Sequence, residues 1–465
     1  MRDLDIITLQ DIPSDILELI YKQLNVFDAS NTNIVTKKEI KIALPTIINS
    51  EEEFYSLPNY FRKYAKVYFN INKKKLNDYL DISELKTEGS MMKYDRLNKL
   101  VKLYCPRAKI GRIMGLKSLK ILNCRESKMM KDVNTLINLT ELECDFCPDL
   151  DKVYRLTKLV KLSCYYTNIR DVSKLINLTE LDCRYSNVRE CGILPKLVKL
   201  KSNKITDFSG VPNLTYLNCV DNSFILNQDI AILTNLKILN CSGTNLSDIN
   251  TLVNLTNLVC NHSHLSDISS LTNLTYLSYN PPIRWNANHE GITSISTLVN
   301  LEQLFCRNSN IKRVNMCTKL VTLDCYQTNI SSINNLVNLR MLNCSGSKII
   351  NLSNQTKLIH LNCSSTLVYN ISMLTNLIKL NCSYSKIKDI SKLTNLTDLD
   401  CSHTKIKDIS TLINLRLLDC SYTDITDLST LVNLEVLDCL KFDHQPPIRN
   451  IDKLPKTCTI KKYRY

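Results

Sequence analysis

A cysteine that returns about every nineteen residues constrains this chain more than any other feature. "TDLDCSHTKIKDIS" begins at Thr397, and "RLLDCSYTDITDLS" repeats the same order of residue types from Arg416. Aligned on this cysteine, eighteen units follow one another, most of them nineteen residues apart. The column residues are Cys105, Cys124, Cys144, Cys164, Cys183, Ser202, Cys219, Cys241, Cys260, Tyr279, Cys306, Cys325, Cys344, Cys363, Cys382, Cys401, Cys420 and Cys439. Self-similarity at a short fixed period predicts a solenoid of stacked units.

Each unit reads roughly L-x-x-L-x-C-x-x-S/T-x-I-x-D-I-S-x-L-x-N. Leu399 and Cys401 alternate with Asp398 and Asp400, which predicts a short strand with the acids on the opposite face. The apolar residues after it return at spacings of three, which is typical of a tight 3₁₀-like or extended segment. One unit cannot bury its own apolar side, so stacking is required, and a parallel sheet along one face is expected.

Residues 96–440 resemble the leucine-rich repeat, L-x-x-L-x-L-x-x-N/C-x-L, with Cys in the third leucine column. The second half of each unit is most similar to the short internalin-type repeat. The resemblance implies an α/β fold class, with a parallel β-sheet on the concave face and short 3₁₀ or extended convex segments. One departure is that the usual ladder-forming Asn column holds Ser or Thr, as in Thr404 and Thr423. A hydroxyl bonds neighbouring backbone less completely than an amide does.

The cysteine column is interpreted as a structural feature, because a thiol is a small, easily buried group that fits a narrow turn. The alternative is a metal-binding or redox ladder. Structural zinc needs paired ligands, but Cys144 and Cys147 form a lone C-x-x-C with no second pair. Neighbouring strands also place column residues about 4.8 Å apart, whereas disulfides need Cβ atoms about 3.8 Å apart. We therefore expect reduced, buried thiols and neither a metal nor another cofactor.

Interruptions and strand residues supply the candidates for target binding. Between Tyr279 and Cys306 the stretch "NPPIRWNANHEG" adds residues, and it contains Arg284 and the single tryptophan, Trp285. Insertions in solenoids map to loops, often on the binding face, and Trp and Arg are favoured anchors. The alternative is a tolerated insertion whose tryptophan covers exposed core.

Strand residues that face away from the core give the other candidates. The residue before the cysteine is often Asn or Asp, and Asn343, Asn362 and Asn381 are expected to bond along a ladder. The consecutive acids Asp400, Asp419 and Asp438 would repel one another at strand spacing, so they favour either a basic partner or solvent. In the first half of the repeats the candidates are Tyr165, Arg184 and Tyr185.

Residues 1–95 lack the repeat, and "LQDIPSDILELIYKQL" within them predicts an amphipathic helix that begins at a proline. This stretch resembles the start of an F-box, L-P-x-E-I/L-I/L-x-x-I/L-F/L-x-x-I/L. The matching positions are Ile12, Pro13, Ile16, Leu17, Ile20 and Leu24. In that family these residues dock on the Skp adaptor of cullin–RING ubiquitin ligases. The later part of the motif is not visible, and the alternative is a cap at the start of the solenoid.

The domain plan that follows is an F-box-like helical region at 1–45, a linker and cap at 46–95, repeats at 96–440, and a C-terminal cap with a basic tail at 441–465. Proteins of this composition and layout resemble F-box and leucine-rich-repeat proteins of giant DNA viruses of amoebae. The resemblance implies a substrate receptor that presents a protein target to a ubiquitin ligase. The alternative is a leucine-rich-repeat binding scaffold or effector without a ligase link.

Composition and charge narrow the expected partners. The net charge is +14, but the basic residues stand singly beside acids, so a nucleic-acid partner is not expected. No run of apolar residues is long enough to span a membrane, and the charged stretch "MRDLDIITLQDIP" leads us to expect no export. We expect a monomer in the cytoplasm or nucleus, in the host cytoplasm if the chain is viral. The six histidines form no catalytic arrangement and glycine is scarce, so an enzyme is not expected.

Overall fold

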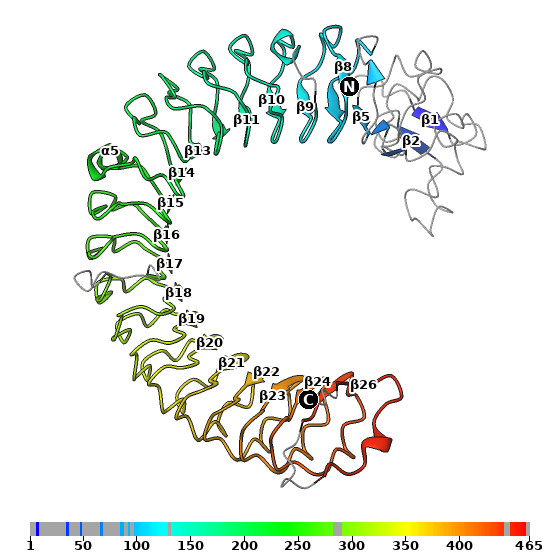
Figure 1. Ribbon diagram of the computed structural model, residues 1–465, viewed down its shortest axis with the longest axis vertical. Helices are drawn as coiled ribbons and strands as arrows, with labels where there is room; N and C mark the ends of the chain where they lie inside the picture. The colour runs from blue at the N-terminus through cyan, green and yellow to red at the C-terminus, as the bar shows by residue number, and fades with distance from the viewer. Residues whose placement is uncertain are drawn as a thin grey trace. The chain divides into compact units, whose positions relative to one another are not determined.

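The computed structural model describes residues 97–128, 132–281, 291–440 and 447–461, together with 84–87 and the backbone of five short strands before residue 94. Of residues 110–112 it describes the backbone only. The chain divides into two compact units, Met1–Leu214 (unit 1) and Thr215–Tyr465 (unit 2). In both units the described repeats are turns of a solenoid, each with one short strand followed by an extended return segment (Figure 1).

The strands of unit 1 form one main parallel sheet and two smaller pairings. The main sheet contains β3 (Ile47–Ile48), β4 (Lys66–Val67), β5 (Glu84–Lys86), β7 (Lys102–Tyr104), β9 (Ile121–Asn123), β10 (Glu141–Glu143), β11 (Lys161–Ser163), β12 (Glu180–Asp182) and β13 (Lys199–Lys201). The other pairs are β1 (Ile6–Thr8) with β2 (Ile34–Thr36), antiparallel, and β6 (Met92–Lys93) with β8 (Ile110–Arg112), parallel. A 3₁₀ turn, η4, spans Val133–Thr135.

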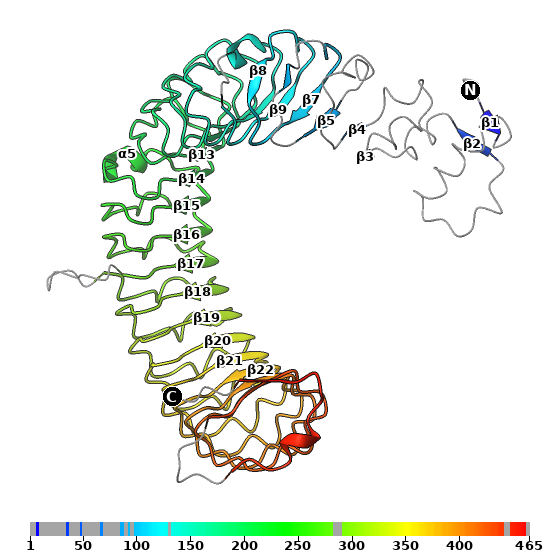
Figure 2. The ribbon, with the colours of Figure 1, turned by 45° about the vertical axis from the view of Figure 1, so that its right-hand side comes forward.

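Unit 2 holds a second run of parallel strands in sequence order (Figure 2). They are β14 (Tyr216–Asn218), β15 (Ile238–Asn240), β16 (Asn257–Val259), β17 (Tyr276–Ser278), β18 (Gln303–Phe305), β19 (Thr322–Asp324), β20 (Met341–Asn343), β21 (His360–Asn362), β22 (Lys379–Asn381), β23 (Asp398–Asp400), β24 (Leu417–Asp419), β25 (Val436–Asp438) and β26 (Thr459–Lys461). The strands lie on the inner side of this unit. The helix α5 (Asn227–Ala231) and the 3₁₀ turn η5 (Ile451–Lys453) complete it.

Each of the eighteen column residues directly follows one strand, six in unit 1 and twelve in unit 2. The middle residue of each of these strands is a buried leucine, and its two neighbours point away from the core. In the turn of Cys401, the core also contains Leu396, Ile406 and Ile409, all nearly inaccessible to solvent. The predicted parallel-sheet solenoid is therefore confirmed. Its helical part, within the described residues, is limited to α5 and the two 3₁₀ turns.

The return segments are mostly extended, with hydrogen-bonded turns at the spacing-of-three positions. The Leu412 N–H donates to the Ile409 carbonyl at 3.0 Å, and the Leu415 N–H donates to Leu412 at 3.2 Å. Acidic residues shape the preceding bend: the Asp389 carboxylate accepts the Ser391 N–H at 2.9 Å. That bond and one from the Ser391 hydroxyl lower the pKa of Asp389. The recurrent Asp of the consensus is thus a turn former.

The stacking of turns depends on asparagines that the sequence analysis did not assign to this task. Asn395, six residues before Cys401, donates its side-chain amide to the Thr375 carbonyl of the preceding turn at 3.0 Å. The same bond recurs at Asn414, to Thr394, at 3.0 Å. The Ser/Thr column instead bonds within its own turn, since the Thr404 hydroxyl donates to the Cys401 backbone carbonyl at 2.6 Å. The asparagine ladder is therefore present, but on the segment that leads into the strand.

Two expectations concern the ends of the repeat region. The parallel sheet of unit 1 includes β3, β4 and β5, which lie within the segment expected to be a linker and cap. At the other end, β26 pairs in parallel with β25 and supplies a last strand. The predicted helix from Pro13 to Leu24, and with it the helical N-terminal domain, lies outside the described residues.

Candidate binding surfaces

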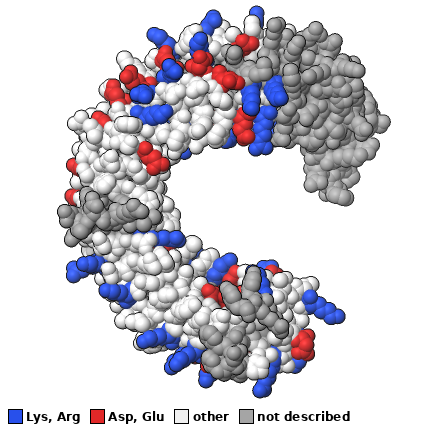
Figure 3. All heavy atoms as spheres, viewed as in Figure 1, with Lys and Arg blue, Asp and Glu red and all other residues white. Residues whose placement is uncertain are grey.

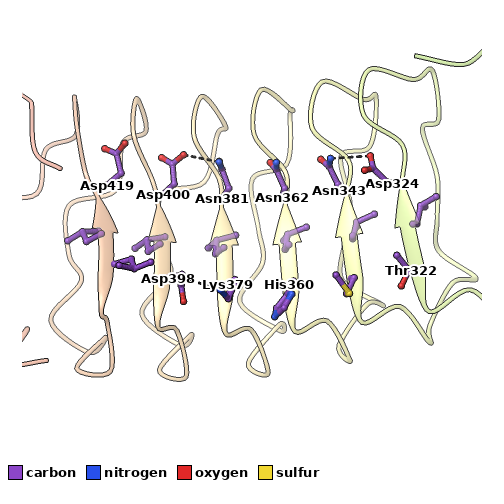
Figure 4. A pocket seen from close by; sticks show the side chains of 18 of the residues that line it. Thr322, Asp324, Asn343, His360, Asn362, Lys379, Asn381, Asp398, Asp400 and Asp419 are labelled. Carbon is purple, nitrogen blue, oxygen red and sulfur yellow. Dashed lines mark hydrogen bonds and ion pairs between the residues drawn. The ribbon is translucent and has the colours of Figure 1, made fainter. Parts of the chain in front are cut away.

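The strand face of each unit carries two rows of outward side chains, one on each side of the buried leucine. Because strand side chains alternate, the residues one and three positions before the column cysteine share this face. Over β19 to β25 of unit 2, the first row is Asp324, Asn343, Asn362, Asn381, Asp400 and Asp419, which Figure 4 labels, followed by Asp438. The second row is Thr322, Met341, His360, Lys379, Asp398, Leu417 and Val436.

These rows line an open groove of about 720 Å³ on unit 2, which extends from Phe305 to Lys461. The groove combines exposed apolar side chains with charged ones. Met341 is 46% exposed and Leu417 is 40% exposed, although both lie on strands. The strand leucines, such as Leu399, form its floor. A surface of this kind can take a polypeptide that offers both apolar and charged groups.

The Asn and Asp row also closes the turn after each strand. The side-chain amide oxygen of Asn381 accepts the Ser383 N–H at 3.1 Å, and the Asp419 carboxylate accepts the Ser421 N–H at 2.9 Å. This corrects the expectation that Asn343, Asn362 and Asn381 bond to one another. Their oxygens accept N–H groups two residues on, and the Asn343 amide donates to Asp324 at 3.1 Å. The bond to the backbone N–H of the same turn replaces a bond between asparagine side chains, because an Asx turn requires no second side chain.

The acids of the groove differ in how they are neutralised. Arg307 forms an ion pair with Asp324 at 2.6 Å, and this contact raises the pKa of the Arg307 guanidinium. Lys379 lies 3.4 Å from Asp398. Asp400 accepts the Asn381 amide at 2.8 Å and the Ser402 hydroxyl at 2.7 Å.

Asp419 and Asp438 likewise bond to neutral donors of the turns. The Ser421 N–H donates to Asp419 at 2.9 Å, and the Ser421 hydroxyl donates to Asp438 at 3.2 Å. Among the described residues, no cation lies within ion-pair distance of Asp400, Asp419 or Asp438. Lys461 lines the same groove opposite Asp438 but forms no ion pair with it. In the described part of the chain, three consecutive strands therefore present carboxylates to the groove without an ion-paired cation.

The strand face of unit 1 differs around β12, where the acids pair with cations. Glu180 lies between Lys161 and Lys199, at 4.0 and 3.2 Å. Asp182 accepts Arg184 at 2.7 Å and Lys201 at 3.3 Å. The lysine pairs span neighbouring strands, whereas Arg184 belongs to the same turn as Asp182. These pairs compensate for the like charges that stacking would otherwise bring together.

An aromatic cluster lies beside these charges in unit 1, at the ends of β10, β11 and β12. The Tyr165 ring is 5.0 Å from Phe146 and 5.4 Å from Tyr185, both edge to face. Tyr166 completes the cluster, 5.8 Å from Phe146. The Arg184 guanidinium lies 5.2 Å from the centre of the Tyr165 ring. Such contacts are cation–π interactions and hold the ring in place.

A second aromatic row occurs in unit 2, where His403 stacks between Tyr384 and Tyr422 at 4.2 and 4.4 Å. Like Phe146, Tyr166 and Tyr185, these three residues lie two positions after the column cysteine and have positive φ angles near 55°. This conformation is uncommon for bulky residues. It is supported by backbone bonds between turns, such as that from the His403 N–H to Ser421 at 2.9 Å.

The structure thus brings the predicted site residues together in two sets. Tyr165, Arg184 and Tyr185 share the cluster of unit 1. Asp400, Asp419 and Asp438 line the groove of unit 2. Arg284 and Trp285 lie outside the described residues. Phe146 and Tyr166 were not predicted, although their shared position two residues after the cysteine was a usable signal. Met341 and Leu417 were not predicted either, although period-two alternation places both on the strand face.

The cysteines are free, and all are buried except Cys439 and Cys458, which are half-buried. Cys147 takes the Ser/Thr position of its turn, and its thiol donates to the Cys124 carbonyl at 3.0 Å. Within the described ranges no group of three metal-ligating side chains comes together. Nor do those ranges contain a helix with the length and apolar character needed to cross a membrane.

On the face shown in Figure 3, lysines and arginines lie as separate spots among neutral and acidic residues. They do not merge into one continuous patch there. This agrees with the scattered basic residues of the sequence. An electrostatic footprint for nucleic acid requires basic residues gathered on one face.

Comparison with known proteins identifies the repeat. Residues 375–414 match the family model described as leucine-rich repeats, two copies. These turns are leucine-rich repeats. No curated protein sequence matches the chain. An F-box or a viral protein is not among the matches described here, so those parts of the resemblance stay predictions.

Solved leucine-rich-repeat structures share the fold at low identity. One is the ectodomain of the receptor kinase GASSHO1/SCHENGEN3 from Arabidopsis thaliana, in complex with CASPARIAN STRIP INTEGRITY FACTOR 2, with a TM-score of 0.59 and 18% identity over 85% of this chain. This chain spans 60% of that ectodomain. Another is the Arabidopsis receptor kinase HAESA with an IDA peptide hormone ligand, with a TM-score of 0.51, 15% identity, and coverage of 81% of this chain and 73% of that one. A third, with a TM-score of 0.53, is the plant peptide hormone receptor RGFR1 with RGF2, at 16% identity over 81% of this chain and 73% of that one.

Proposed function

We propose that this chain is a protein-binding solenoid that holds its target on the strand face. The observation that carries the proposal is the groove of unit 2, a concave surface of about 720 Å³ with exposed apolar residues among charged ones. Exposed apolar side chains on a strand face cost solvation free energy unless a partner covers them. The three solved proteins of similar fold bind a peptide hormone or a protein factor, which supports the same use here.

The test compares matched substitutions inside and outside the groove. A library of displayed protein fragments is selected on the full chain. Binders are then measured against Met341→Arg with Leu417→Arg, and against Met373→Arg with Ile413→Arg. The second pair is similar in type and exposure, at 58% and 52%, but lies outside the strands. We expect the groove pair to weaken binding at least about tenfold and the outer pair to leave it unchanged, with equal melting temperatures. Equal effects of both pairs would remove the strand face as the binding surface.

A narrower role, target receptor of a cullin–RING ubiquitin ligase, rests on the resemblance of Ile12 to Leu24 to an F-box. In that reading, the N-terminal helix docks on a Skp-type adaptor while the repeats hold the target. The adaptor and the cullin would then be partners, and the receptor would act by raising the effective concentration of the target near the ligase. The sequence resemblance is its support, and a variant that decides it is described in the Discussion.

A further inference from the structure

The groove of unit 2 has a distinct composition at its end over β23, β24 and β25. On β24, Leu417 and Asp419 share the outward face, and on β25 Val436 and Asp438 do the same. Residues two apart on a strand are separated by about 6.6 Å. An apolar row therefore runs beside an acidic row across neighbouring strands.

This pairing fits a long cationic side chain better than any neutral one. Lysine and arginine lay their aliphatic stems on apolar surface and keep the charged head beyond it. A stem over Leu417 would bring the head to Asp419, and a stem over Val436 would bring it to Asp438. The bonds from Ser421 occupy one oxygen of each of these carboxylates, Oδ1.

Several other acids on the described strand faces lie beside a cation of the chain. In unit 1, Asp182 and Glu180 pair with lysine or arginine, whereas Glu143 accepts the side-chain amide of Asn123. In the same groove, Asp324 on β19 pairs with Arg307, and Asp398 on β23 pairs with Lys379. Like charges on adjacent strands destabilise the sheet. An external cation would relieve the repulsion among the three carboxylates.

We infer that this end of the groove binds an extended segment of a partner protein that carries two long cationic side chains, held by Asp400, Asp419 and Asp438 over Leu417 and Val436. This inference rests on the proposed function and specifies the chemistry of its partner. The stem over Leu417 directs its head to the adjacent carboxylates of Asp419 and Asp400, and the stem over Val436 directs its head to Asp438. Asp400 and Asp438 are two strands apart, which is about 9.6 Å at the usual strand spacing. Residues three apart in a polyproline II segment are separated by about 9.3 Å. The expected motif is therefore Arg or Lys at positions i and i+3.

The experiment uses the full chain and fluorescent proline-rich peptides followed by anisotropy. One peptide has arginines three residues apart, a second has them adjacent, and a third has glutamines in their place. We expect the first to bind at least about tenfold more tightly than the third, more tightly than the second, and with lower affinity at high salt. Equal binding of the first and third peptides would overturn the inference.

The protein variants are chosen to keep the fold. Asp400→Asn with Asp438→Asn removes two charges, and Asn in the same row at Asn381 shows that an amide still closes the turn. The control is Asp389→Asn with Asp408→Asn, which removes two charges from return segments in the turns beside Asp400. The inference requires a loss of at least about tenfold in the first variant and none in the control. Equal losses of peptide affinity in both variants would show that binding depends on the net charge of the chain and not on these two carboxylates.

The same assay distinguishes two other occupants of the groove, a metal ion and the C-terminal tail of the chain. If Mg²⁺ or Ca²⁺ at millimolar concentration binds in calorimetry and displaces the peptide, the carboxylates hold a metal ion and the inference fails. If the peptide binds only after deletion of residues 462–465, which include Lys462 and Arg464, the chain's own tail is the occupant and the inference also fails. Library binders that remain sensitive to Met341→Arg but not to Asp400→Asn with Asp438→Asn would preserve the proposed function and reject only the basic motif.

Discussion

At the scale of single residues, the cysteine column is explained by more than the small size of a thiol. The Cys401 thiol donates to the Asp419 carbonyl of the next turn at 3.5 Å, and the Cys401 N–H donates to the same oxygen at 2.9 Å. A leucine in this position could not make the first of these bonds. Burial raises the pKa of the Cys382 thiol well above its usual value, so this column stays protonated.

Thiol reactivity tests this account. In the native protein, a thiol reagent should label Cys439 and Cys458 first, because the other eighteen of the twenty cysteines are buried. Denaturant should release the rest. Cys382→Ser should be tolerated, since Ser202 occupies the same column, whereas Cys382→Asp should cost several kcal/mol because it buries a carboxylate without a partner. Rapid native labelling of most thiols would contradict the buried column.

Residue-level prediction succeeded where periodicity alone decides the outcome and failed where backbone geometry decides it. The burial of Leu399 and Cys401 follows from period-two alternation. The aromatic cluster around Tyr165 was seen only in part, because the positions of Phe146 and Tyr166 depend on a positive φ angle that favours no aromatic residue. The role of Asn395 was missed because its acceptor, the Thr375 carbonyl, belongs to another turn.

At the scale of the turn, the ladder of side-chain amides is a measurable stabiliser. Asn395→Ala should lower the free energy of unfolding by about 1 kcal/mol, because it removes one hydrogen bond between turns. Asn433, an exposed residue six positions before Cys439 with a bond of 3.1 Å to the Ile413 carbonyl, is the matched site. The loss at Asn395, whose bond is 3.0 Å, should be at least as large. Urea unfolding measures both, and no change at Asn395 would show that water replaces the ladder bond.

The longest turn shows how the sheet accommodates extra residues. β17 pairs with β18 in register, Tyr276 opposite Gln303, although their column residues are separated by the insertion. Tyr279 takes the place of cysteine there, and its hydroxyl accepts the Ile292 N–H at 3.2 Å. Burial raises the pKa of Tyr279 to about 12. The larger ring fills a turn that a thiol would leave underpacked.

Shortening this insertion separates binding from folding. Cutting residues 281–291 back to repeat length should leave the melting temperature nearly unchanged, because the strands on both sides already pair in register. If Trp285 is an anchor for the target, the same change should weaken a target complex by about 2 kcal/mol or more. Trp285→Ala in the full-length loop is the control for loop length. A large loss of stability with unchanged binding would assign the loop to covering the core.

At the scale of the whole chain, the repeats and the N-terminal segment make separable contributions. A solenoid turn contacts only its neighbours, so a change before the first turns should not reach distant ones. Strand pairing among the described residues is consistent with this, since each repeat strand pairs with those of adjacent turns. Damage to an N-terminal docking helix and damage to a solenoid cap therefore have different consequences.

Leu17→Asp combined with Ile20→Asp distinguishes the ligase receptor from the plain scaffold. If Ile12 to Leu24 form an F-box helix, the double variant should lose co-purification of a Skp-type adaptor and cullin, while the repeats stay folded and still bind the target. If the same stripe caps the solenoid, two buried charges should destabilise the first turns, around Cys105 and Cys124, by about 3 kcal/mol or more. The wild-type chain would then bring down no adaptor. One pull-down and one melt measure both quantities, and a wild-type chain without adaptor leaves the protein-binding solenoid as its function, because the groove and its carboxylates do not depend on the N-terminal segment.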